Sequence, residues 1–473
     1  MSIPAHIFRE YDIRGLHETE LTDAVAEAVG RAFATLIGEG AAPGARAAGG
    51  GVEATGPRVA LGRDVRPSSE RLAQAVERGI RAAGVAVERV GVVPTPALYY
   101  AVVARGADGG LQVTGSHNPP EFNGFKMTRR TLPVFGTDIQ AMRERIARGD
   151  LVQAASPAGA ADWPILDAYR AMLVDRLPSP RRLKVVMDCG NGCAGTVVPE
   201  VFEQMGHTVI PLFAELDGRF PNHLPDPTVP ALLQSLIAEV RRTGADLGIG
   251  FDGDADRIGA VDADGGIVFG DQLLALFARD VLSRVPGAEI IFDVKCSQGL
   301  IEDIAIHGGR PSMWKTGHSL IKSRLHETGA PLAGEMSGHM FFSEGFFGFD
   351  DALFAAGRLL RYVAASGRSL ADLVDSIPHY HATPETRLAC PEDRKFAVVE
   401  EVKREFAGRY KVIDIDGVRV EFGDGWGLVR ASNTQPVLVV RFEARTPERL
   451  EEIRRLFMEP LARLGVGEAT VGH

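Results

Sequence analysis

Three aspartates at alternating positions are the feature of this sequence that most clearly predicts chemistry. Asp252, Asp254 and Asp256 stand in "DGDADR", directly after the apolar run "LGIGF". Clustered carboxylates repel one another unless a cation neutralises them, and hard oxygen ligands suit Mg²⁺, Mn²⁺ or Ca²⁺. An EF-hand begins in a similar way but needs glycine and glutamate where this chain has Arg257 and Ala263. The sequence therefore predicts a divalent-metal site of another type.

A serine in "TGSHNPP" (residues 114–120) is the candidate for covalent chemistry. The glycine before Ser116 frees the backbone, and the two prolines that follow restrict it. Ser116 does not stand in the G-x-S-x-G elbow of α/β-hydrolases. A free serine is a weak nucleophile, so its chemistry would depend on neighbouring groups. An ordinary turn serine is the alternative interpretation.

Two further loops combine charged and hydroxyl side chains. "RASNTQP" places Arg430, Ser432, Asn433 and Thr434 in one turn, and a guanidinium fork with hydroxyls suits a phosphate dianion. An ordinary turn centred on asparagine is the alternative. "GEMSGH" places donors and acceptors between glycines, which suits sugar hydroxyls; its polar members are Glu335, Ser337 and His339. The remaining polar candidates are Tyr11, Arg14, Lys126, Lys295 and His318.

The size and composition of the chain limit the classes of function. A chain of 473 residues is too long for one hydrophobic core, so three or four domains are expected. The formal net charge of −10 opposes a nucleic-acid or anionic-membrane partner. The four cysteines lack zinc-binding spacing, so buried reduced thiols are expected. The charged N-terminus and the lack of an apolar run of ~18 residues predict a soluble, cytoplasmic protein.

The elements that must position these loops recur along the chain. Three apolar strand patterns each precede a helix and a second strand, and each unit then reaches a short strand that ends in one of the loops. The first strands are 58–64, 183–189 and 289–297. This recurrence predicts three copies of one α/β architecture with largely parallel sheets. Ligands bind at the carboxyl ends of such strands, where the three loops stand.

Other segments differ from these units. A helix is expected over about 22–37, a surface loop over 38–58, and a linker over 148–164. The last ~95 residues predict an α+β domain with two helices around an antiparallel meander, and "RASNTQP" joins two of its strands.

Taken together, the motifs resemble those of the α-D-phosphohexomutase superfamily. "EYDIRG", "TGSHNPP", "DGDADR", "GEMSGH" and "RASNTQP" occur in the family's order, from residue 10 to residue 436. "GEMSGH" looks most like the bacterial phosphomannomutase/phosphoglucomutase branch, because the phosphoglucosamine branch typically has Gln where Met336 stands.

The resemblance implies a fold of four domains around a central cleft. Three related α/β domains with mixed, largely parallel sheets would precede a smaller C-terminal α+β domain. The expected ranges are 1–163 with the phosphoserine loop, 164–266 with the metal-binding loop, 267–378 with the sugar-binding loop and 379–473 with the phosphate-binding loop.

The resemblance also implies an activity, which is reversible phosphoryl transfer between O1 and O6 of a hexose phosphate. Ser116 would be phosphorylated at rest and would give its phosphoryl group to a hexose 1-phosphate, which forms a 1,6-bisphosphate. This bisphosphate, also an activator, would turn over in the cleft, and Ser116 would take back the phosphoryl group from O1. Mg²⁺ would be the metal cofactor.

The roles that the resemblance implies divide into three groups. The metal would lie between Ser116, Asp252, Asp254 and Asp256. Catalytic residues besides Ser116 would be Arg257, Lys126, His117, Arg14 and His339, with His339 favoured as the base. The substrate would contact Tyr11, Lys295, His318, Glu335, Ser337, His339, Arg430, Ser432, Asn433 and Thr434.

Two alternatives stay open, a phosphoglucosamine mutase and a metal-dependent sugar phosphatase. The sequence does not decide between glucose and mannose substrates. Expected partners are small sugar phosphates, without nucleic acid or membrane, and the expected state is a monomer or a weak dimer.

Overall fold

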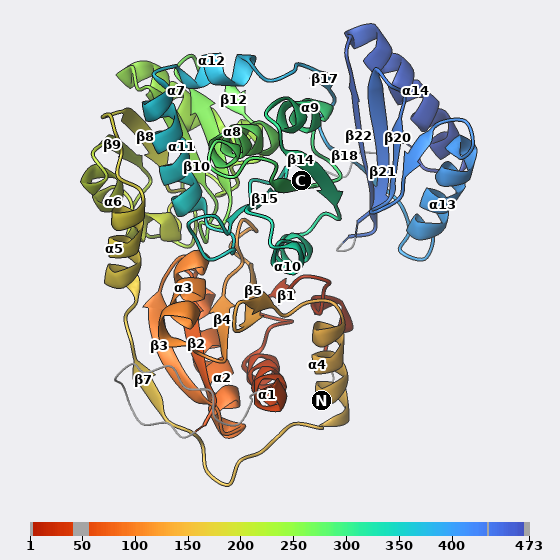
Figure 1. The fold of residues 1–473 in the computed structure, drawn as a ribbon. Helices are drawn as coiled ribbons and strands as arrows, with labels where there is room; N and C mark the ends of the chain where they lie inside the picture. The colour runs from red at the N-terminus through yellow and green to blue at the C-terminus, as the bar shows by residue number, and fades with distance from the viewer. Residues whose placement is uncertain (1–2, 41–55, 433–434, 468–473) are drawn as a thin grey trace.

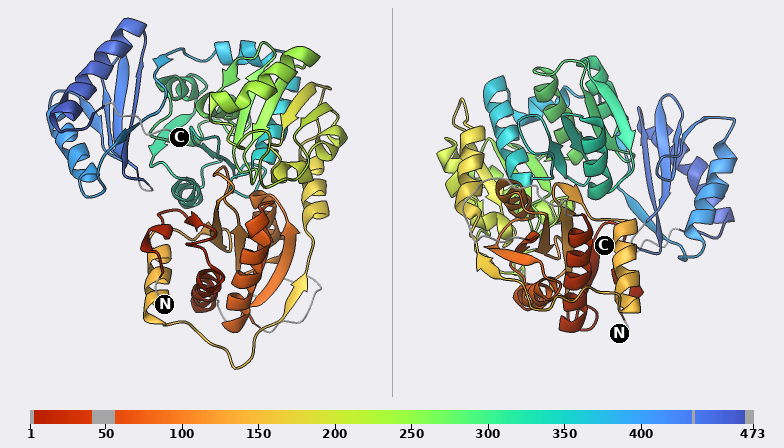
Figure 2. Two further views of the ribbon diagram at one scale, coloured as in Figure 1. Left: turned by 180° about the vertical axis from the view of Figure 1, so that it is seen from behind. Right: turned by 60° about the horizontal axis from the view of Figure 1, so that its bottom comes forward.

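The computed structural model describes residues 3–40, 56–432 and 435–467 and contains four β-sheets, each with its own helices. We number the domains built on them 1 to 4 in chain order. In Figure 1, domain 1 (red to orange) lies below domains 2 and 3 (green to teal), and domain 4 (blue) stands to the side of domain 3. Figure 2 shows the same arrangement from two other directions. Most of the predicted 38–58 loop lies outside the described residues.

Domain 1 is a mixed sheet in the order β1-β5-β4-β2-β3-β7, with β6 beside β5. Strands β4, β2, β3 and β7 are parallel, whereas β1 and β5 run antiparallel to their neighbours. The strands are β1 (Ile13–Leu16), β2 (Arg58–Arg63), β3 (Ala86–Val92), β4 (Gly109–Val113), β5 (Phe122–Arg129), β6 (Leu132–Pro133) and β7 (Ala160–Asp162). The helices are α1 (Asp23–Gly40), α2 (Pro67–Ala82), α3 (Thr95–Arg105) and α4 (Thr137–Arg148), after the 3-10 turn η1 (Ala5–Ile7).

Strand β7 corrects one expectation, because it lies inside the segment predicted to be a linker. Its three residues pair with Val87, Glu88 and Arg89 of β3 and extend the sheet by one edge strand. An edge strand of this length is held by main-chain hydrogen bonds and carries no apolar alternation, so the sequence pattern gave no sign of it.

Domain 2 has the sheet order β12-β11-β10-β8-β9, and domain 3 has the order β14-β13-β15-β16. The strands are β8 (Lys184–Asp188), β9 (Thr208–Leu212), β10 (Leu247–Phe251), β11 (Ile258–Asp262), β12 (Ile267–Val268), β13 (Glu289–Asp293), β14 (Arg310–Trp314), β15 (Leu332–Gly334) and β16 (Met340–Phe342). The helices are α5 (Leu166–Arg176), α6 (Glu200–Gln204), α7 (Gln234–Thr243), α8 (Gly270–Leu282), α9 (Gln298–Ile306), α10 (His318–Thr328), α11 (Ala352–Ser366) and α12 (Leu370–Asp375), with 3-10 turns η2 (Cys193–Thr196) and η3 (Pro230–Leu233).

Domains 1, 2 and 3 share one arrangement of four strands, which confirms the predicted repeat. Each has three parallel strands followed by an antiparallel one, in the orders β3-β2-β4-β5, β9-β8-β10-β11 and β14-β13-β15-β16. The polypeptide turns back after the third parallel strand of each set. These turns carry Ser116, the three aspartates and Glu335, so the repeat places all three loops at the carboxyl edges of sheets.

Domain 4 is an antiparallel sheet in the order β17-β22-β21-β20-β19, with β18 also paired to β22. The predicted meander is confirmed by its strands β17 (His381–Ala382), β18 (Thr386–Ala389), β19 (Lys411–Ile413), β20 (Val418–Glu421), β21 (Gly425–Ala431) and β22 (Val437–Ala444). Helices α13 (Lys395–Phe406) and α14 (Pro447–Arg463) cover one face around Phe406 and Phe457, whose rings stack at 4.6 Å.

The apolar core shows how firmly the domains are joined. One continuous cluster runs from Leu98 of α3 through Phe202 of domain 2 to Phe277 of α8, so domains 2 and 3 share a core to which one face of domain 1 also belongs. Domain 4 has a core of its own and meets domain 3 through a small apolar cluster of Val294, Trp426 and Leu428 and through Arg419, which donates to the Val294 and Cys296 carbonyls at 2.8 Å. All four cysteines are buried and free. None of the described helices is long and apolar enough to cross a membrane.

A buried pair ties α5 to the start of α11. Asp351 caps α11 by accepting from the Phe354 N–H at 2.8 Å, and its other oxygen accepts from the Tyr169 hydroxyl at 2.7 Å. Burial raises the pKa of Asp351 to about 7, although both hydrogen bonds favour the charged form. Between pH ~4 and about 7, Asp351 therefore binds a proton in the folded protein that it has released in the unfolded chain.

We predict that Asp351→Asn gains stability relative to the wild-type chain as pH rises. The folded pKa of about 7 exceeds the unfolded value, so the stabilising contribution is complete below pH ~4 and is lost as pH rises through about 7. Asparagine is neutral throughout and keeps the capping oxygen. The melting temperature of the variant minus that of the wild type should increase between pH 5 and 8, and exposed Asp167→Asn should show no such trend. A difference that stays constant with pH would contradict this assignment.

Candidate functional site

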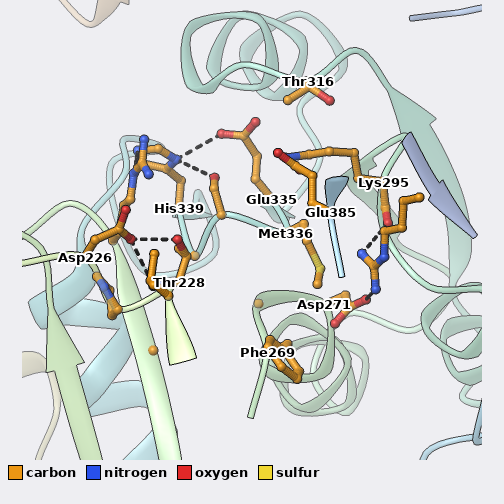
Figure 3. Close-up of a pocket in the computed structure, with 18 of the residues that line it drawn as sticks. Asp226, Thr228, Phe269, Asp271, Lys295, Thr316, Glu335, Met336, His339 and Glu385 are labelled. Carbon is orange, nitrogen blue, oxygen red and sulfur yellow. Dashed lines mark hydrogen bonds and ion pairs between the residues drawn. The ribbon is translucent and has the colours of Figure 1, made fainter. Parts of the chain in front are cut away.

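The predicted loops converge on one cleft of about 1270 Å³, lined by residues of all four domains. The residues that line it include Tyr11, Arg14, Ser116, His117, Lys126, Arg257, Lys295, His318, Glu335, Ser337, His339, Arg430 and Ser432. Figure 3 shows part of this cleft, with Glu335 and His339 on one side and Lys295 and Glu385 on another. Asn433 and Thr434 lie outside the described residues.

Ser116 points at the acidic loop of domain 2. Its Oγ donates to Asp252 Oδ2 at 2.6 Å and lies 3.1 Å from His117 Nδ1. Ser116 is 1% exposed, and its φ of 49° is a left-handed conformation that non-glycine residues seldom adopt. The strained backbone of Ser116 and the hydrogen bond from its hydroxyl to a carboxylate argue against the alternative that it is an ordinary turn serine.

A single buried arginine holds this loop in place. Arg66 donates to four main-chain oxygens of the loop at 2.5 to 3.0 Å, and its Nε donates to Asp64 at 3.1 Å; the four acceptors belong to Ser116, Asn118, Pro119 and Phe122. A Cβ at Gly115 would lie 2.5 Å from this guanidinium, which explains the glycine. Arg66 belongs to none of the sequence motifs, although it follows β2 and so stands at the same sheet edge.

The acidic loop forms a compact buried cluster. One oxygen each from Asp252, Asp254 and Asp256 lie within 4.8 Å of one another, and all three side chains are 0% exposed. Lys126 of β5 contacts Asp254 Oδ2 at 2.8 Å and also pairs with Asp256. Burial opposes the ammonium, but the two carboxylates outweigh it and raise the pKa of Lys126. Burial and the neighbouring charges of Asp256 and Asp254 raise the pKa of Asp252 well above its ordinary value.

The cluster fits a divalent cation. Asp254 Oδ1 and Asp256 Oδ1 are buried and have no hydrogen-bond partner in the part of the chain that the structure describes. Buried oxygens without hydrogen-bond partners are rare, so these two carboxylates each have an oxygen that could bind a cation. Carboxylate oxygens are the ligands that Mg²⁺ and Mn²⁺ prefer, so the residues present match the predicted metal type.

His339 connects the acidic cluster to the sugar loop. Its Nε2 lies 3.4 Å from Asp256 Oδ1 and 3.3 Å from Arg257 Nε, while its Nδ1 lies 3.1 Å from Glu335 Oε2. Burial lowers the pKa of His339, but Asp256 and Glu335 raise it overall to about 9. Ser337 Oγ is 3.0 Å from the same Nδ1. The imidazole is therefore charged at neutral pH and spans domains 2 and 3.

Glu335 is also fixed from the other side, because Gly317 N–H donates to its Oε1 at 2.7 Å. The neighbouring carbonyl of Thr316 accepts from the Tyr11 hydroxyl at 2.8 Å, which joins domain 1 to domain 3. Arg14 donates to Asp12 at 2.6 Å and to Asn118 Oδ1 at 3.0 Å, next to the serine loop. Tyr11 of domain 1 and Glu335 of domain 3 are thus held by adjacent residues of the same loop, Thr316 and Gly317.

A second, basic region lies where domains 3 and 4 meet. Arg430 at the end of β21 pairs with Asp416 at 3.0 Å, and Asp416 also accepts from Thr316 N–H at 3.0 Å. Lys295 pairs with Glu385 at 3.1 Å, and its charge, against the effect of burial, lowers the pKa of Glu385 to about 2. Arg387 and Gln435 also line this part of the cleft. Asp416 and Glu385 belong to none of the sequence motifs, so the sequence gave no signal for them.

Comparisons with known proteins agree with this geometry. Four family models match in order: phosphoglucomutase/phosphomannomutase alpha/beta/alpha domains I, II and III over residues 5–152, 167–266 and 269–380, and the C-terminal domain over 385–459. The chain belongs to the phosphoglucomutase/phosphomannomutase family. This membership confirms both the resemblance and the predicted fold class.

Individual relatives of the family cover nearly the whole chain. A phosphomannomutase/phosphoglucomutase of Pseudomonas aeruginosa is 47% identical over 97% of this chain and 96% of its own length. A phosphoglucomutase of Neisseria gonorrhoeae is 44% identical over 96% of each chain. A crystal structure of a phosphoglucomutase/phosphomannomutase family protein from Burkholderia thailandensis has a TM-score of 0.90 at 41% identity, with coverage of 99% and 100%.

We predict that Arg66→Lys lowers the kcat/KM of the protein and leaves the protein folded. Lysine keeps the charge, but one ammonium cannot reach four diverging carbonyls, so Ser116 loses its fixed place. Loss of one or two charged hydrogen bonds of ~1.5–3 kcal/mol corresponds to roughly ten- to a hundredfold in kcat/KM. Steady-state kinetics and a melting curve measure both effects, with Arg89→Lys, a half-exposed arginine of domain 1, as control. An unchanged kcat/KM would contradict a positioning role.

Proposed function

We propose that the chain moves a phosphoryl group reversibly between O1 and O6 of a hexose phosphate, with Ser116 as the covalent carrier and a hexose 1,6-bisphosphate as intermediate. The observation that carries the proposal is the 2.6 Å hydrogen bond from Ser116 Oγ to Asp252, inside a carboxylate cluster that fits a divalent cation. The same cleft has a basic region that fits a second phosphate. An exchange between the two ends of one sugar requires a site where the phosphoryl group is transferred and a site that binds the phosphate that does not react. We call these the reacting pole and the anchoring pole of the cleft.

The reacting pole uses groups from domains 1, 2 and 3. Phosphorylated Ser116 transfers its phosphoryl group to the free sugar hydroxyl; the O–P bond to serine breaks as the new bond forms. The sequence favoured His339 as the base, but its raised pKa of about 9 leaves it charged at neutral pH and unable to accept a proton. Burial lowers the pKa of His117, whose Nδ1 lies 3.1 Å from Ser116 Oγ, so we assign to His117 the transfer of the proton between the sugar hydroxyl and that oxygen. The groups that counter negative charge are Arg257, Lys126, His339 and Arg14. A bound Mg²⁺, held by Asp252, Asp254 and Asp256 with Ser116, would neutralise charge on the transferred group.

The anchoring pole binds the phosphate that does not react. We assign it to Lys295, Arg430 and Ser432, with Asn433 and Thr434 as proposed additions. Glu335, Ser337, Tyr11 and His318 would hold the sugar between the poles. A cleft of about 1270 Å³ exceeds the ~300–1,000 Å³ of ordinary ligand pockets, which leaves room for the bisphosphate to exchange its ends.

The sequence identities to named relatives favour hexose phosphates without a 2-amino group as the substrates. Those named phosphomannomutase/phosphoglucomutase or phosphoglucomutase are 43–47% identical to the chain, whereas one named probable phosphoglucosamine mutase, from Methanopyrus kandleri, is 34% identical. Met336 lines the cleft in Figure 3, where the glucosamine branch typically has Gln. We therefore propose glucose and mannose phosphates as the substrates.

We predict that a bisphosphate labelled with ³²P labels wild-type protein on Ser116 and that Ser116→Ala takes up no label and loses mutase activity. Assays with glucose, mannose and glucosamine 1-phosphates should give the 6-phosphates of the first two without net release of inorganic phosphate. Ser283→Ala, an exposed serine on domain 3, serves as control. Full activity of Ser116→Ala would refute the covalent carrier, and stoichiometric phosphate release would indicate a phosphatase.

We predict that Arg430→Ala raises KM for both the 1-phosphate and the 6-phosphate, because one anchor serves both orientations. A charged hydrogen bond of ~1.5–3 kcal/mol corresponds to roughly ten- to a hundredfold. Arg430→Lys should recover part of the loss, because an ammonium lacks the guanidinium fork. Exposed Arg404→Ala in the same domain is the control. An effect on only one direction would assign Arg430 to a single orientation.

A further inference from the structure

A buried aspartate behind the cleft faces His318, one of the residues that lines it. Asp350 is 0% exposed, and its Oδ2 lies 3.5 Å from His318 Nδ1. Its Oδ1 lies 2.6 Å from the Lys322 ammonium, one turn further along α10. The His318 ring stacks on His339 at 5.3 Å and meets the edge of the Tyr11 ring at 6.2 Å. Neighbours on three sides therefore fix this imidazole.

The two ring nitrogens of His318 differ in their surroundings: one is buried and the other is exposed to the cleft. Nδ1 is buried, has no hydrogen-bond partner among the described residues, and faces the carboxylate. Nε2 is absent from the buried atoms that lack partners and makes no hydrogen bond to any described residue, so it is the nitrogen exposed to the cleft. A carboxylate at Nδ1 favours a proton on that nitrogen and a lone pair on the other.

Lys322 explains why a carboxylate at this distance leaves the imidazole neutral. The ammonium neutralises Asp350 and lies 4.0 Å from the centre of the Tyr99 ring, so neither charge is buried without a partner. Burial lowers the pKa of His318, and the opposing effect of Asp350 does not reverse the shift. Burial opposes the charge on Asp350, but Lys322 and His318 lower its pKa overall. The stacked pair thus combines a charged His339 with a neutral His318.

We infer that Asp350 is a positioning residue for substrate binding. It holds neutral His318 with Nδ1–H toward its carboxylate, so that Nε2 accepts a hydrogen bond from a hydroxyl of the bound hexose phosphate. The identity of the ligand rests on the proposed function, whereas the tautomer of His318 in the free protein does not. Asp350 belongs to none of the sequence motifs: it stands two residues before α11, and its partners His318 and Lys322 lie on α10.

The substitution Asp350→Asn reverses the direction of this interaction. Lys322 would attract the amide oxygen, which turns the amide nitrogen, a donor, toward His318 Nδ1. The imidazole would then carry its proton on Nε2, which could no longer accept from a substrate hydroxyl. Asp303→Asn is the matched control, because Asp303 is also buried in domain 3, pairs with Arg279 and lies 3.5 Å from His307 Nδ1, outside the cleft.

The first test is ¹⁵N NMR of histidine-labelled free protein, with His318 assigned by its loss in His318→Gln. We expect the Nδ1–H form in the wild type and the Nε2–H form in Asp350→Asn, with His318 unchanged in Asp303→Asn. If Asp350→Asn does not fold, Lys322→Met provides the second variant. An unneutralised Asp350 should then convert His318 to the imidazolium. An Nε2–H tautomer in the wild type, or a signal unaffected by these substitutions, would overturn the inference.

The second test is a double-mutant cycle on hexose 1-phosphate kinetics. Asp350→Asn should raise KM roughly three- to tenfold, with a smaller change in kcat, as expected for the loss of one hydrogen bond. In the His318→Gln background the same substitution should have no further effect, because Asp350 acts through His318. Equal losses in both backgrounds would mean a merely structural role. Absence of mutase activity in the wild type would refute the proposed function and leave the NMR result to decide the role of Asp350.

Discussion

The structure depends on the neutralisation of the negative charge of three carboxylates that are buried at the junction of two domains. Asp252, Asp254 and Asp256 come from domain 2, but Lys126, which pairs with Asp254 and Asp256, comes from domain 1. A buried charge costs several kcal/mol unless it is paired, so the two domains cannot separate without exposing or stranding these groups. Thr95 of α3 reinforces the junction, because its hydroxyl and its N–H donate to Asp254 at 2.5 and 2.9 Å.

This junction also aligns the reacting groups. A Cβ at Gly253 would lie 2.4 Å from the Ser116 carbonyl oxygen, so the metal loop and the serine loop touch with no side chain between them. Arg66 fixes the serine loop from within domain 1, and its guanidinium lies 5.0 Å from the ring of Phe220 in domain 2. The position of Ser116 Oγ is therefore set by two domains at once. Domain 4 contributes to the basic region and joins domain 3 through a small apolar cluster and hydrogen bonds of Arg419, whereas domains 2 and 3 share a large apolar core.

Much of the fold and of the cleft could be predicted from the sequence, because the repeat unit has a strong pattern. Strands β4, β10 and β15 each end in a loop of unusual composition, and the carboxyl edge of a parallel sheet is where such loops meet. Strand β7 was missed because an edge strand needs no apolar alternation. Arg66 and Asp350 were missed because they act on main-chain carbonyls and on a partner in another element, which leaves no local signature. Asn433 and Thr434 lie outside the described residues.

The measurement that tests the central claim most directly is anomalous diffraction from crystals soaked in Mn²⁺, which substitutes for Mg²⁺ with the same preference for oxygen ligands. The account predicts one strong peak bound by the carboxylates of Asp252, Asp254 and Asp256, next to the side chain of Ser116. The Oδ1 atoms of Asp254 and Asp256, which have no hydrogen-bond partner among the described residues, should be among the ligands. A peak elsewhere in the cleft, or none at this cluster in crystals whose protein turns over hexose phosphate with Mn²⁺, would contradict the account.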